Sequence, residues 1–581
     1  MGNYYLDNED IQSYFDFIDM KKLAEIQEEY AANGDADYVP FDLDDAVDGY
    51  RRILEIAGAI SADTLAKNAE QVDEEGNTLN ADGTVTLHPL VRENLKRMTQ
   101  ADLMGFTLPR RYGGLNCPTL IYTMATEIVS RGDTSFMNMF GLQGIAETIN
   151  AFASQEIKDE TLHRFCTGEV TGAMVLTEPD AGSDLQSVRL RADYDEATGQ
   201  WLLNGVKRFI TNGCGEILLT LARSEHEIDD GRGLSLFISE RNEHVKVRHL
   251  EHKLGIHGSP TCELVFTNCP ARLIGDRQRG LITYVMALMN GARLGIAAQS
   301  LGTAEAAFRL ARAYANSRCQ FGGPIENLPP VAELLTDSRV SIEAARALAY
   351  ETAAVCDREQ NALRLTETIA DLPAEKAKPL KKLSKQLKRL NSMLTPMSKL
   401  YASEMCNKVA YDGIQVLGGS GYMKDYAAER YARDARITNI YEGTSQLQVV
   451  AAIKGITSGV FQSYVEEFEA TVFDDAELEA LKAELVSAKE KILRAVEFVK
   501  AKSVTYTDLM ARRLVEMGMD VIIGHYLLKQ AALCSRKKMV VKYFIAREMP
   551  EIDKNFQRIL SGSQLAVDAY LEIVGDVPAA E

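Results

Sequence analysis

Arg433-Asp-Ala-Arg-Ile-Thr-Asn-Ile-Tyr-Glu-Gly-Thr-Ser-Gln446 is the stretch from which the rest of this chain can be interpreted. It places one carboxylate, Glu442, between Tyr441 and Gly443. Apolar and aromatic neighbours disfavour the charged form of a carboxylate, so its pKa is expected to rise toward neutral pH. Such a carboxylate suits a general base that removes a weakly acidic C–H proton, and the Gly443 amide could donate to a developing oxyanion. Taken alone, the same residues also fit a surface Glu-Gly pair at a helix end.

Four further segments accompany this stretch. They are Met174-Val-Leu-Thr-Glu-Pro-Asp-Ala-Gly-Ser-Asp184, Gly205-Val-Lys-Arg-Phe-Ile-Thr-Asn-Gly213, Ser317-Arg-Cys-Gln-Phe-Gly-Gly-Pro324 and Gln415-Val-Leu-Gly-Gly-Ser-Gly-Tyr422. In order and approximate spacing, the five segments resemble the acyl-CoA dehydrogenase family. The resemblance covers roughly residues 85–460 of the 581. It is strongest to a longer bacterial branch that includes 3-methylmercaptopropionyl-CoA dehydrogenase, which also carries an N-terminal extension, an insertion and a further helical domain.

The pattern along the chain predicts a mainly α protein with a central β domain. Short alternating apolar runs separated by turn residues occupy residues 171–281 and are typical of antiparallel strands. Helical patterns lie on both sides, so separate domains are expected and a doubly wound fold is not. The predicted domains are an N-terminal helical domain with an extension, the β domain, a C-terminal helical bundle with an insertion near 357–396, and an additional helical domain: 1–170, 171–281, 282–461 and 462–581. In the last of these, apolar Leu478, Leu481, Leu485 and Ile492 recur at helical intervals.

Composition restricts the compartment and the partners. The net charge of −19 opposes nonspecific nucleic-acid binding. Nine cysteines without a CxxC pair fit reduced thiols in the cytoplasm and not a zinc site or a disulfide framework. The N-terminus lacks the basic and apolar regions of a signal peptide, and we find no apolar stretch approaching a membrane span. Membrane association is therefore not expected, although the basic stretch 376–389 leaves an anionic lipid or acidic partner as the alternative to a solvated helix face.

The resemblance implies FAD as the cofactor, since no Walker loop and no GxGxxG opening a βαβ unit is present. It implies FAD contacts from one subunit at Leu176, Thr177, Ser183, Phe209, Thr211, Thr444 and Gln446. It further implies contacts from a second subunit at Arg318, Phe321, Gln415, Gly418 and Gly419, and hence a homo-oligomer. We expect a homodimer, because the helical region beyond residue 462 would cover the face that shorter relatives use to form tetramers.

The resemblance also implies the reaction. Glu442 would take the α-proton of an acyl-CoA thioester while FAD accepts the β-hydride, giving the 2-enoyl-CoA. Expected substrate contacts are Ser183, Arg293, Tyr441 and Gly443. Some relatives carry the base on a bundle helix, but Ala292 occupies that place here, so Glu442 has no rival. The electrons would pass to an electron-transferring flavoprotein or a similar acceptor, in the degradation of fatty or other carboxylic acids.

At two places the sequence departs from the family pattern, so the cofactor and CoA contacts expected there stay undecided. Leu328-Pro-Pro-Val331 replaces a segment that usually holds a glutamine near the flavin nucleotide, and His257 stands where arginine is common. His257 could contact CoA or be a structural histidine, the reading we favour. Two alternative functions remain: an acyl-CoA oxidase using O2, and a non-catalytic relative of the fold. The acyl group depends on pocket depth, with Phe136–Gly144 as the expected wall.

Overall fold

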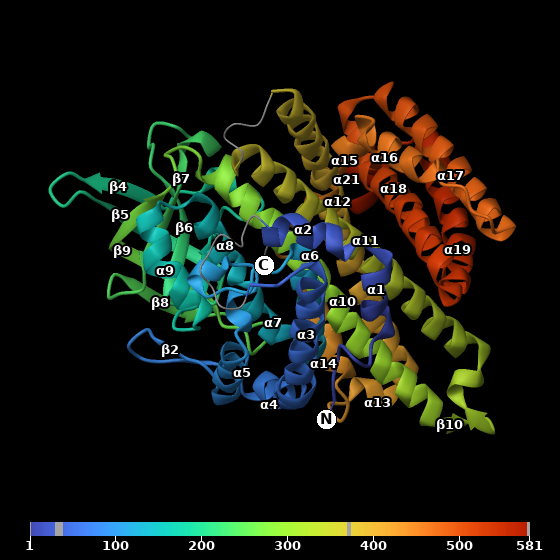
Figure 1. Ribbon diagram of the computed structural model, residues 1–581, viewed down its shortest axis with the longest axis horizontal. Coiled ribbons are helices and arrows are strands. Elements are labelled where there is room, and N and C mark those ends of the chain that lie inside the picture. The colour runs from blue at the N-terminus through green and yellow to red at the C-terminus, as the bar shows by residue number, and fades with distance from the viewer. Residues whose placement is uncertain (1, 30–38, 369–373, 578–581) are drawn as a thin grey trace. The chain divides into compact units, whose positions relative to one another are not determined.

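The computed structural model describes residues 2–29, 39–368 and 374–577 (Figure 1). The described chain forms two compact units. Unit 1 consists of Met1–Ser384 with Ser398–Thr444, and unit 2 of Lys385–Met397 with Ser445–Glu581. The division into four domains stays a prediction, and part of the expected insertion near 357–396 lies outside the described residues.

The N-terminal part of unit 1 is helical, as predicted. Its helices are α1 (Glu9–Phe17), α2 (Met20–Glu29), α3 (Leu43–Ile60), α4 (Ala66–Glu75), α5 (Pro89–Gln100), α6 (Thr119–Gly132), α7 (Thr134–Gly141), α8 (Gln143–Phe152) and α9 (Gln155–Cys166). Side chains cap their first turns: Asp42 accepts from Asp45 N at 2.9 Å, and Asp133 caps α7. Between α4 and α5 lies a short hairpin of β1 (Thr78–Leu79) and β2 (Val85–Thr86).

Seven strands form the β domain. They are β3 (Gly172–Val175), β4 (Arg191–Asp195), β5 (Gln200–Thr211), β6 (Ile217–Arg223), β7 (Leu234–Glu240), β8 (Val245–Leu250) and β9 (Thr261–Ile274). The pairing runs β3-β6-β4-β5-β9-β7, and a β6–β7 pairing closes the path into a ring. Most pairs are antiparallel, as predicted. The exception is β6, which pairs in parallel with β3 and with the first residue of β4, because the long connection after β3 brings the chain back in the same direction.

Two apolar cores hold the β domain in place. One lies inside the ring and includes Leu203, Leu218 and Phe237. The other joins the outer face of β6 and β7 to α8 and α9, and contains Ile149 and Phe165 (Figure 1). Strand β6 is buried along its whole length, including Thr220 and Arg223 within its mainly apolar sequence.

The bundle of unit 1 consists of α10 (Met286–Ser317), α11 (Pro329–Thr368), the last part of α12 (Ala374–Leu417), α13 (Gly419–Tyr422) and α14 (Ala428–Ala435). Helix α10 packs against α6, α11 and α14. Gly302 permits the close approach to α6, since a Cβ there would lie 2.2 Å from the carbonyl oxygen of Glu127.

One stretch of the described residues, Gly280–Ser317, is long and apolar enough to cross a membrane. The expectation that no stretch approaches this length was therefore wrong. Its alanines and leucines pack within the bundle, with Ala297, Ala298 and Leu301 fully buried. An apolar core helix meets the same criterion as a membrane span, so length and composition alone do not indicate insertion.

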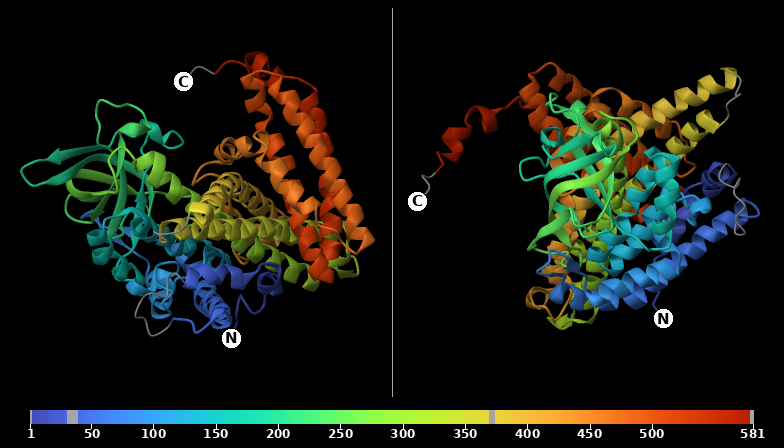
Figure 2. Two further views of the ribbon diagram at one scale, coloured as in Figure 1. Left: turned by 45° about the horizontal axis from the view of Figure 1, so that its top comes forward. Right: turned by 90° about the vertical axis from the view of Figure 1, so that its left-hand side faces the viewer.

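Unit 2 is helical throughout its described residues. It comprises α15 (Ser445–Thr457), α16 (Val460–Glu469), α17 (Ala476–Lys500), α18 (Val504–Leu533), α19 (Ser535–Leu560), α20 (Leu565–Asp568) and α21 (Tyr570–Val574). Helices α17, α18 and α19 lie side by side (Figure 2). The predicted apolar positions Leu478, Leu481, Leu485 and Ile492 are all buried. Gly524 lets α18 approach α17, because a Cβ there would lie 2.6 Å from Leu485.

Candidate functional site

The residues expected at the site form three groups in unit 1. We name them the carboxylate group (Arg293, Tyr441, Glu442, Gly443, Thr444), the sheet group (Leu176, Thr177, Ser183, Phe209, Thr211) and the hairpin group (Arg318, Phe321, Gln415, Gly418, Gly419). Gln446 belongs to unit 2, where it is exposed near the start of α15.

Glu442 lies in the turn between a 3₁₀ turn, Arg436–Asn439, and α15. Its φ is +54°, and that of Gly443 is +87°. Nine described residues other than glycine have a positive φ, and three of them are expected site residues: Phe209, Phe321 and Glu442. Since an L-residue with a side chain of this size rarely adopts such a φ, the surrounding structure must hold these backbones in place.

The turn that carries Glu442 is held by buried polar groups. Lys399 of α12 donates from Nζ to the carbonyl oxygen of Gly443 at 2.8 Å. The Tyr441 hydroxyl lies 3.1 Å from Asn138 Oδ1 and also contacts Gln299. Asn138 is on α7 and Gln299 on α10, so this network connects the turn to the helices on either side of it.

Burial raises the pKa of Glu442 to about 7. Lys399 and Arg293 oppose the rise, because a nearby positive charge favours the carboxylate form. The direction agrees with the sequence-based expectation. The carboxyl is surrounded by protein atoms, while part of the residue remains open to solvent, as access for a reacting molecule requires.

Both cations near Glu442, Lys399 and Arg293, are buried. Lys399 has no exposed surface, and burial lowers its pKa to about 8. Arg293 is 7% exposed on α10; it donates to Asn290 Oδ1 at 3.1 Å, while its Nε is buried without a hydrogen-bond partner in the described structure. Burial also lowers the pKa of Arg293. Glu442 thus lies near two positive charges that are shielded from water.

The sheet group forms a surface suited to a flat aromatic molecule. Lys207 Nζ donates to Leu176 O at 2.7 Å and Arg208 N to Thr177 O at 2.9 Å, so the end of β3 is held against β5. At this point β5 has an irregular register, and Phe209 is 53% exposed. An exposed aromatic ring beside threonine hydroxyls and backbone groups offers both stacking and hydrogen bonding.

The loop after β3 extends this surface. A Cβ on Gly182 would lie 3.9 Å from the Thr177 methyl group, so the loop passes close to Thr177, and Ser183 follows it in an exposed position. Thr211 ends β5 opposite Thr261. The described residues contain no group of three or more His, Cys, Asp or Glu that could hold a metal ion.

An apolar core connects the sheet group with the helix that carries Arg293. Leu176 belongs to the core of β6, β7, α8 and α9, and Met289 packs against the same core. Arg293 follows Met289 by about one helical turn on α10. This core therefore links Leu176 of the sheet group to the helix that carries Arg293 of the carboxylate group.

The hairpin group lies elsewhere on unit 1. Phe321 is 93% exposed at the tip of a hairpin, β10 (Cys319–Gln320) and β11 (Gly323–Pro324). Gly418 and Gly419 are exposed beyond α12, with open space where a Cβ would stand. One small core joins the two parts, since it contains both Ile325 and Leu417. In Figure 1 the hairpin lies on the opposite side of unit 1 from strands β4–β9, so one chain does not bring all three groups together.

Sequence reasoning missed several residues near the site. Lys399 lies in no motif, and only the fold brings it to Gly443. Glu178 accepts from Arg189 N and Leu190 N and pairs with buried Lys207 at 2.9 Å, which fixes the loop after β3.

His257 has its two ring nitrogens at 3.0 Å from Asp73 Oδ1 and 2.9 Å from Lys253 O. The interpretation of His257 as a structural histidine agrees with this geometry.

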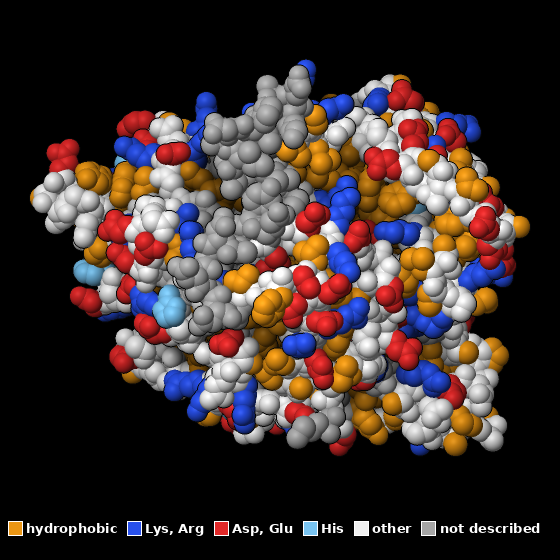
Figure 3. All heavy atoms as spheres, viewed as in Figure 1, with side chains coloured by type: hydrophobic (Ala, Val, Ile, Leu, Met, Phe, Trp, Pro, Cys, Tyr) orange, Lys and Arg blue, Asp and Glu red, His pale blue; other side chains and the backbone are white. Residues whose placement is uncertain are grey.

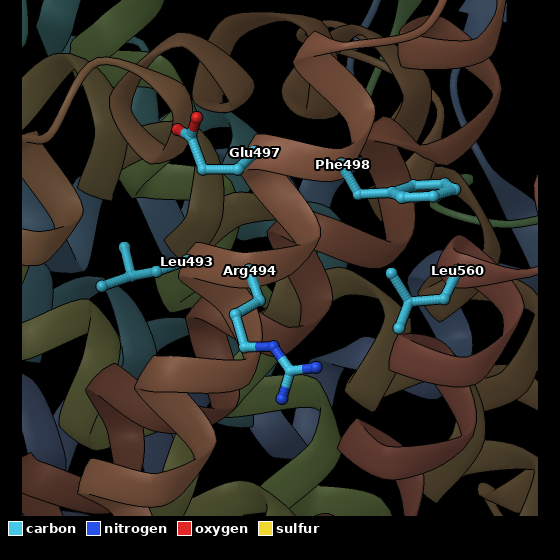
Figure 4. Close-up of a pocket in the computed structure, with 5 residues that line it drawn as sticks. All are labelled: Leu493, Arg494, Glu497, Phe498 and Leu560. Atoms are coloured by element: carbon cyan, nitrogen blue, oxygen red, sulfur yellow. The ribbon is translucent and has the colours of Figure 1, made fainter.

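Two cavities among the described residues are lined by none of the residues in the three groups. An open groove of about 440 Å³ in unit 2 is lined by Leu493, Arg494, Glu497, Phe498 and Leu560 (Figure 4), none of which was expected to act chemically. On the face shown in Figure 3, positive and negative side chains are interspersed without a continuous basic patch.

Comparison with known proteins gives consistent matches along the chain. Family models described as the N-terminal, middle and C-terminal domains of acyl-CoA dehydrogenase match residues 49–169, 173–269 and 279–456. A fourth model, described as acyl-CoA dehydrogenase C terminal, matches residues 457–560. The expected additional domain after residue 462 falls largely within this last match.

Individual proteins agree with the family models. The chain is 36% identical to an acyl-CoA dehydrogenase of Bacillus subtilis (strain 168), over 63% of this chain and 89% of that protein. It is 31% identical to 3-methylmercaptopropionyl-CoA dehydrogenase of Ruegeria pomeroyi, over 71% and 70%. In fold it resembles an acyl-CoA dehydrogenase from Bacillus anthracis crystallised with FAD, with a TM-score of 0.75, 22% identity and 92% coverage of each chain.

Proposed function

The chain belongs to the acyl-CoA dehydrogenase family of FAD-dependent oxidoreductases acting on CH–CH bonds, and from this premise we propose that Glu442 is its catalytic base. In this proposal Glu442 takes the α-proton of an acyl-CoA thioester, and the product is the 2-enoyl-CoA. The observation that carries the proposal is the carboxylate itself. It is buried beside two cations, its pKa is about 7, and it stands on a turn with a positive φ.

A pKa near 7 suits the proposed proton transfer. At neutral pH a large fraction of Glu442 is ionised, and the carboxylate is more basic than an ordinary glutamate. The α-proton must also become more acidic, and backbone N–H groups in a water-poor site stabilise the developing enolate oxygen. We assign this role to the backbone of the Glu442–Gly443 turn, as the family resemblance implies. Tyr441 would line the acyl pocket, with its hydroxyl held by Asn138 and Gln299.

FAD, when bound, supplies the hydride acceptor. The sheet group offers an exposed aromatic side chain, two threonines and the backbone beside them, a donor set that fits a flavin ring. We propose that Leu176, Thr177, Ser183, Phe209 and Thr211 hold the flavin end, and that Thr444 and Gln446 contact the adenosine portion.

The hairpin group supports the proposal of a homodimer. The hairpin that carries exposed Arg318 and Phe321 lies on the opposite side of unit 1 from strands β4–β9 (Figure 1), so we propose that these residues reach the FAD of a second copy. Arg318→Ala should then weaken FAD retention much more than acyl-CoA selectivity, as measured by released flavin fluorescence. Light scattering should give a mass near two chains. Stoichiometric FAD on a monomer would contradict this proposal, and a mass near four chains would contradict the dimer.

The direct test of function is a panel of acyl-CoA thioesters assayed with an artificial electron acceptor. The panel should vary chain length, branching and sulfur content, because the wall expected at Phe136–Gly144 contains Met137 and Met139, which adapt to different shapes. Formation of 2-enoyl-CoA by one class of thioester would identify the substrate. No product from any thioester, with FAD bound, would reject the proposed reaction.

For the electron acceptor we propose an electron-transferring flavoprotein or a similar carrier, in a degradative route for carboxylic acids. The alternative is an oxidase that passes the electrons to O2. Stopped-flow reoxidation of the reduced protein in air distinguishes them, since an oxidase would be reoxidised within its turnover time. We also propose a cytoplasmic location, because the nine cysteines include no CxxC pair and have no regular spacing.

A further inference from the structure

Lys399 has no role in the function proposed so far, yet it is one of the most deeply buried charged groups of unit 1. It lies on α12, and its side chain has no exposed surface. Burying an ammonium group without compensation costs several kcal/mol. The compensation visible here is one hydrogen bond, 2.8 Å from Nζ to the carbonyl oxygen of Gly443, and the negative charge of nearby Glu442.

The hydrogen bond places Lys399 at the catalytic turn. Gly443 directly follows Glu442, and both residues have a positive φ. A donor on the Gly443 carbonyl fixes the orientation of the peptide that follows the carboxylate-bearing residue. An apolar side chain at position 399 would fill the space, but it would leave this carbonyl without its ammonium partner and would remove one of the two cations that lower the pKa of Glu442.

The charges around Glu442 can be named element by element. Lys399 faces it from α12 and Arg293 from α10, while Tyr441 precedes it in the turn. Glu404, one helical turn further along α12, adds a negative charge near Lys399. Arg293 lies on a different element and does not contact the Gly443 carbonyl in any hydrogen bond found in the described structure. Lys399 is therefore the cation that both donates to the turn and acts on the carboxylate.

We propose that Lys399 is a positioning residue for the dehydrogenation, which orients the Glu442–Gly443 turn by its hydrogen bond and keeps Glu442 ionised by its charge. The inference rests on Glu442 being the base. It assigns no proton transfer to Lys399 itself. The lowered pKa of Lys399, about 8, leaves the ammonium mostly protonated near neutral pH, where the role requires it.

The test compares Lys399→Met, Lys399→Arg and a control, Lys408→Met, in the full-length FAD-containing protein. Lys408 lies on the same helix, is mostly exposed and pairs with Asp412. Two readouts are needed: the pH dependence of kcat/KM, and an infrared titration of the Glu442 carboxyl without substrate, identified by its loss in Glu442→Gln. The infrared readout is independent of turnover.

In Lys399→Met we expect the protonation midpoint of Glu442 to rise by about one pH unit or more, equivalent to a tenfold change in ionisation. At pH 7, kcat/KM should fall about fivefold or more, because the ionised fraction of Glu442 falls from about a half to about a tenth, and the deficit should shrink as the pH rises. Lys399→Arg should keep the midpoint within about half a unit, and Lys408→Met should match the wild type. An unchanged midpoint in Lys399→Met would overturn the proposal.

Two further outcomes keep the test decisive. If Lys399→Met does not fold, Lys399→Arg provides the test. This variant keeps the positive charge, so a protonation midpoint of Glu442 that rises by a full unit would overturn the role of that charge. If Glu442→Gln is as active as the wild type, the proposed base is wrong, whatever the Lys399 variants show. The failure of the proposed function is thereby separated from the failure of this inference.

Discussion

Two buried glutamates of unit 1, Glu305 and Glu442, have pKa values displaced in opposite directions. Burial pushes both upward. At Glu305 the charges of Arg346, Arg309 and Arg339 outweigh burial and lower the pKa to about 2. At Glu442 burial outweighs Lys399 and Arg293, and the pKa is about 7. The difference shows that burial alone does not give a carboxyl the pKa of a general base. The pKa also depends on how strongly neighbouring cations stabilise the ionised form.

The hydrogen bonds explain the contrast. Glu305 accepts from Arg309 Nε at 2.6 Å and from Arg346 Nη2 at 3.0 Å. Arg346 also donates to Glu127 at 2.6 Å and contacts Asp10 at 3.4 Å, which ties α1, α6, α10 and α11 together. This network of ion pairs stabilises the ionised form of Glu305 and holds the four helices together. At Glu442, Lys399 and Arg293 lower the pKa by less than burial raises it, so the carboxyl still binds a proton near neutral pH.

The largest expected effect is the loss of activity when Glu442 is substituted. Glu442→Gln keeps the size of the side chain and removes its basicity, so turnover should fall by about 10²–10⁴-fold or more. FAD content and the circular dichroism spectrum should not change. Steady-state assays with the best thioester would measure this, and a variant with more than a tenth of wild-type turnover would exclude Glu442 as the base.

The next effect concerns stability. Arg346→Met leaves Glu127, Glu305 and Asp10 without their shared partner in the interior, and removal of one member of such a network typically costs about 3–5 kcal/mol. Chemical denaturation would measure the loss. The control is Arg232→Met, which breaks an exposed pair with Asp230 and should leave the denaturation midpoint unchanged. Equal midpoints for the two variants would contradict the structural role of the network.

A smaller effect appears in acid. Because the folded-state pKa of Glu305 lies below its ordinary value of 4.5, its contribution to stability is present above pH 4.5 and is lost as the pH falls toward 2. Glu305→Gln should lack this contribution, of about 3 kcal/mol. The gap in unfolding free energy between wild type and variant should therefore be widest near pH 6 and should narrow below pH 4.5. A gap of constant width would show that Glu305 titrates normally.

The smallest expected effect is the pH dependence of catalysis. Since Glu442 must be ionised to act, kcat/KM of the wild type should increase about tenfold per unit as the pH rises toward 7, and then level off. No comparable step should arise from Glu305, which is ionised throughout this range. An ascending limb with its midpoint near pH 4.5 would mean that burial has little effect on Glu442 in the working protein.

The comparison also shows what the extension contributes. Helix α1 precedes the part of the chain that the family models match, which begins at residue 49. Its Asp10 is nevertheless buried in the network of Arg346. The sequence predicted helices in this region, and nothing in the local sequence indicates that this one carboxylate enters the core.

The sequence by itself determined the order of helical and β regions, because apolar periods of 3.6 and 2 are local properties. Glu442 and the groups expected around FAD could be predicted from the sequence, because these residues stand in contiguous segments. Only the tertiary structure decided the parallel pairing of β3 with β6, the wide separation of the hairpin group from the sheet group, and the presence of Lys399 at the Gly443 carbonyl. Lys399 and Gly443 are 44 positions apart, and a contact between such distant residues depends on packing, which no local pattern records.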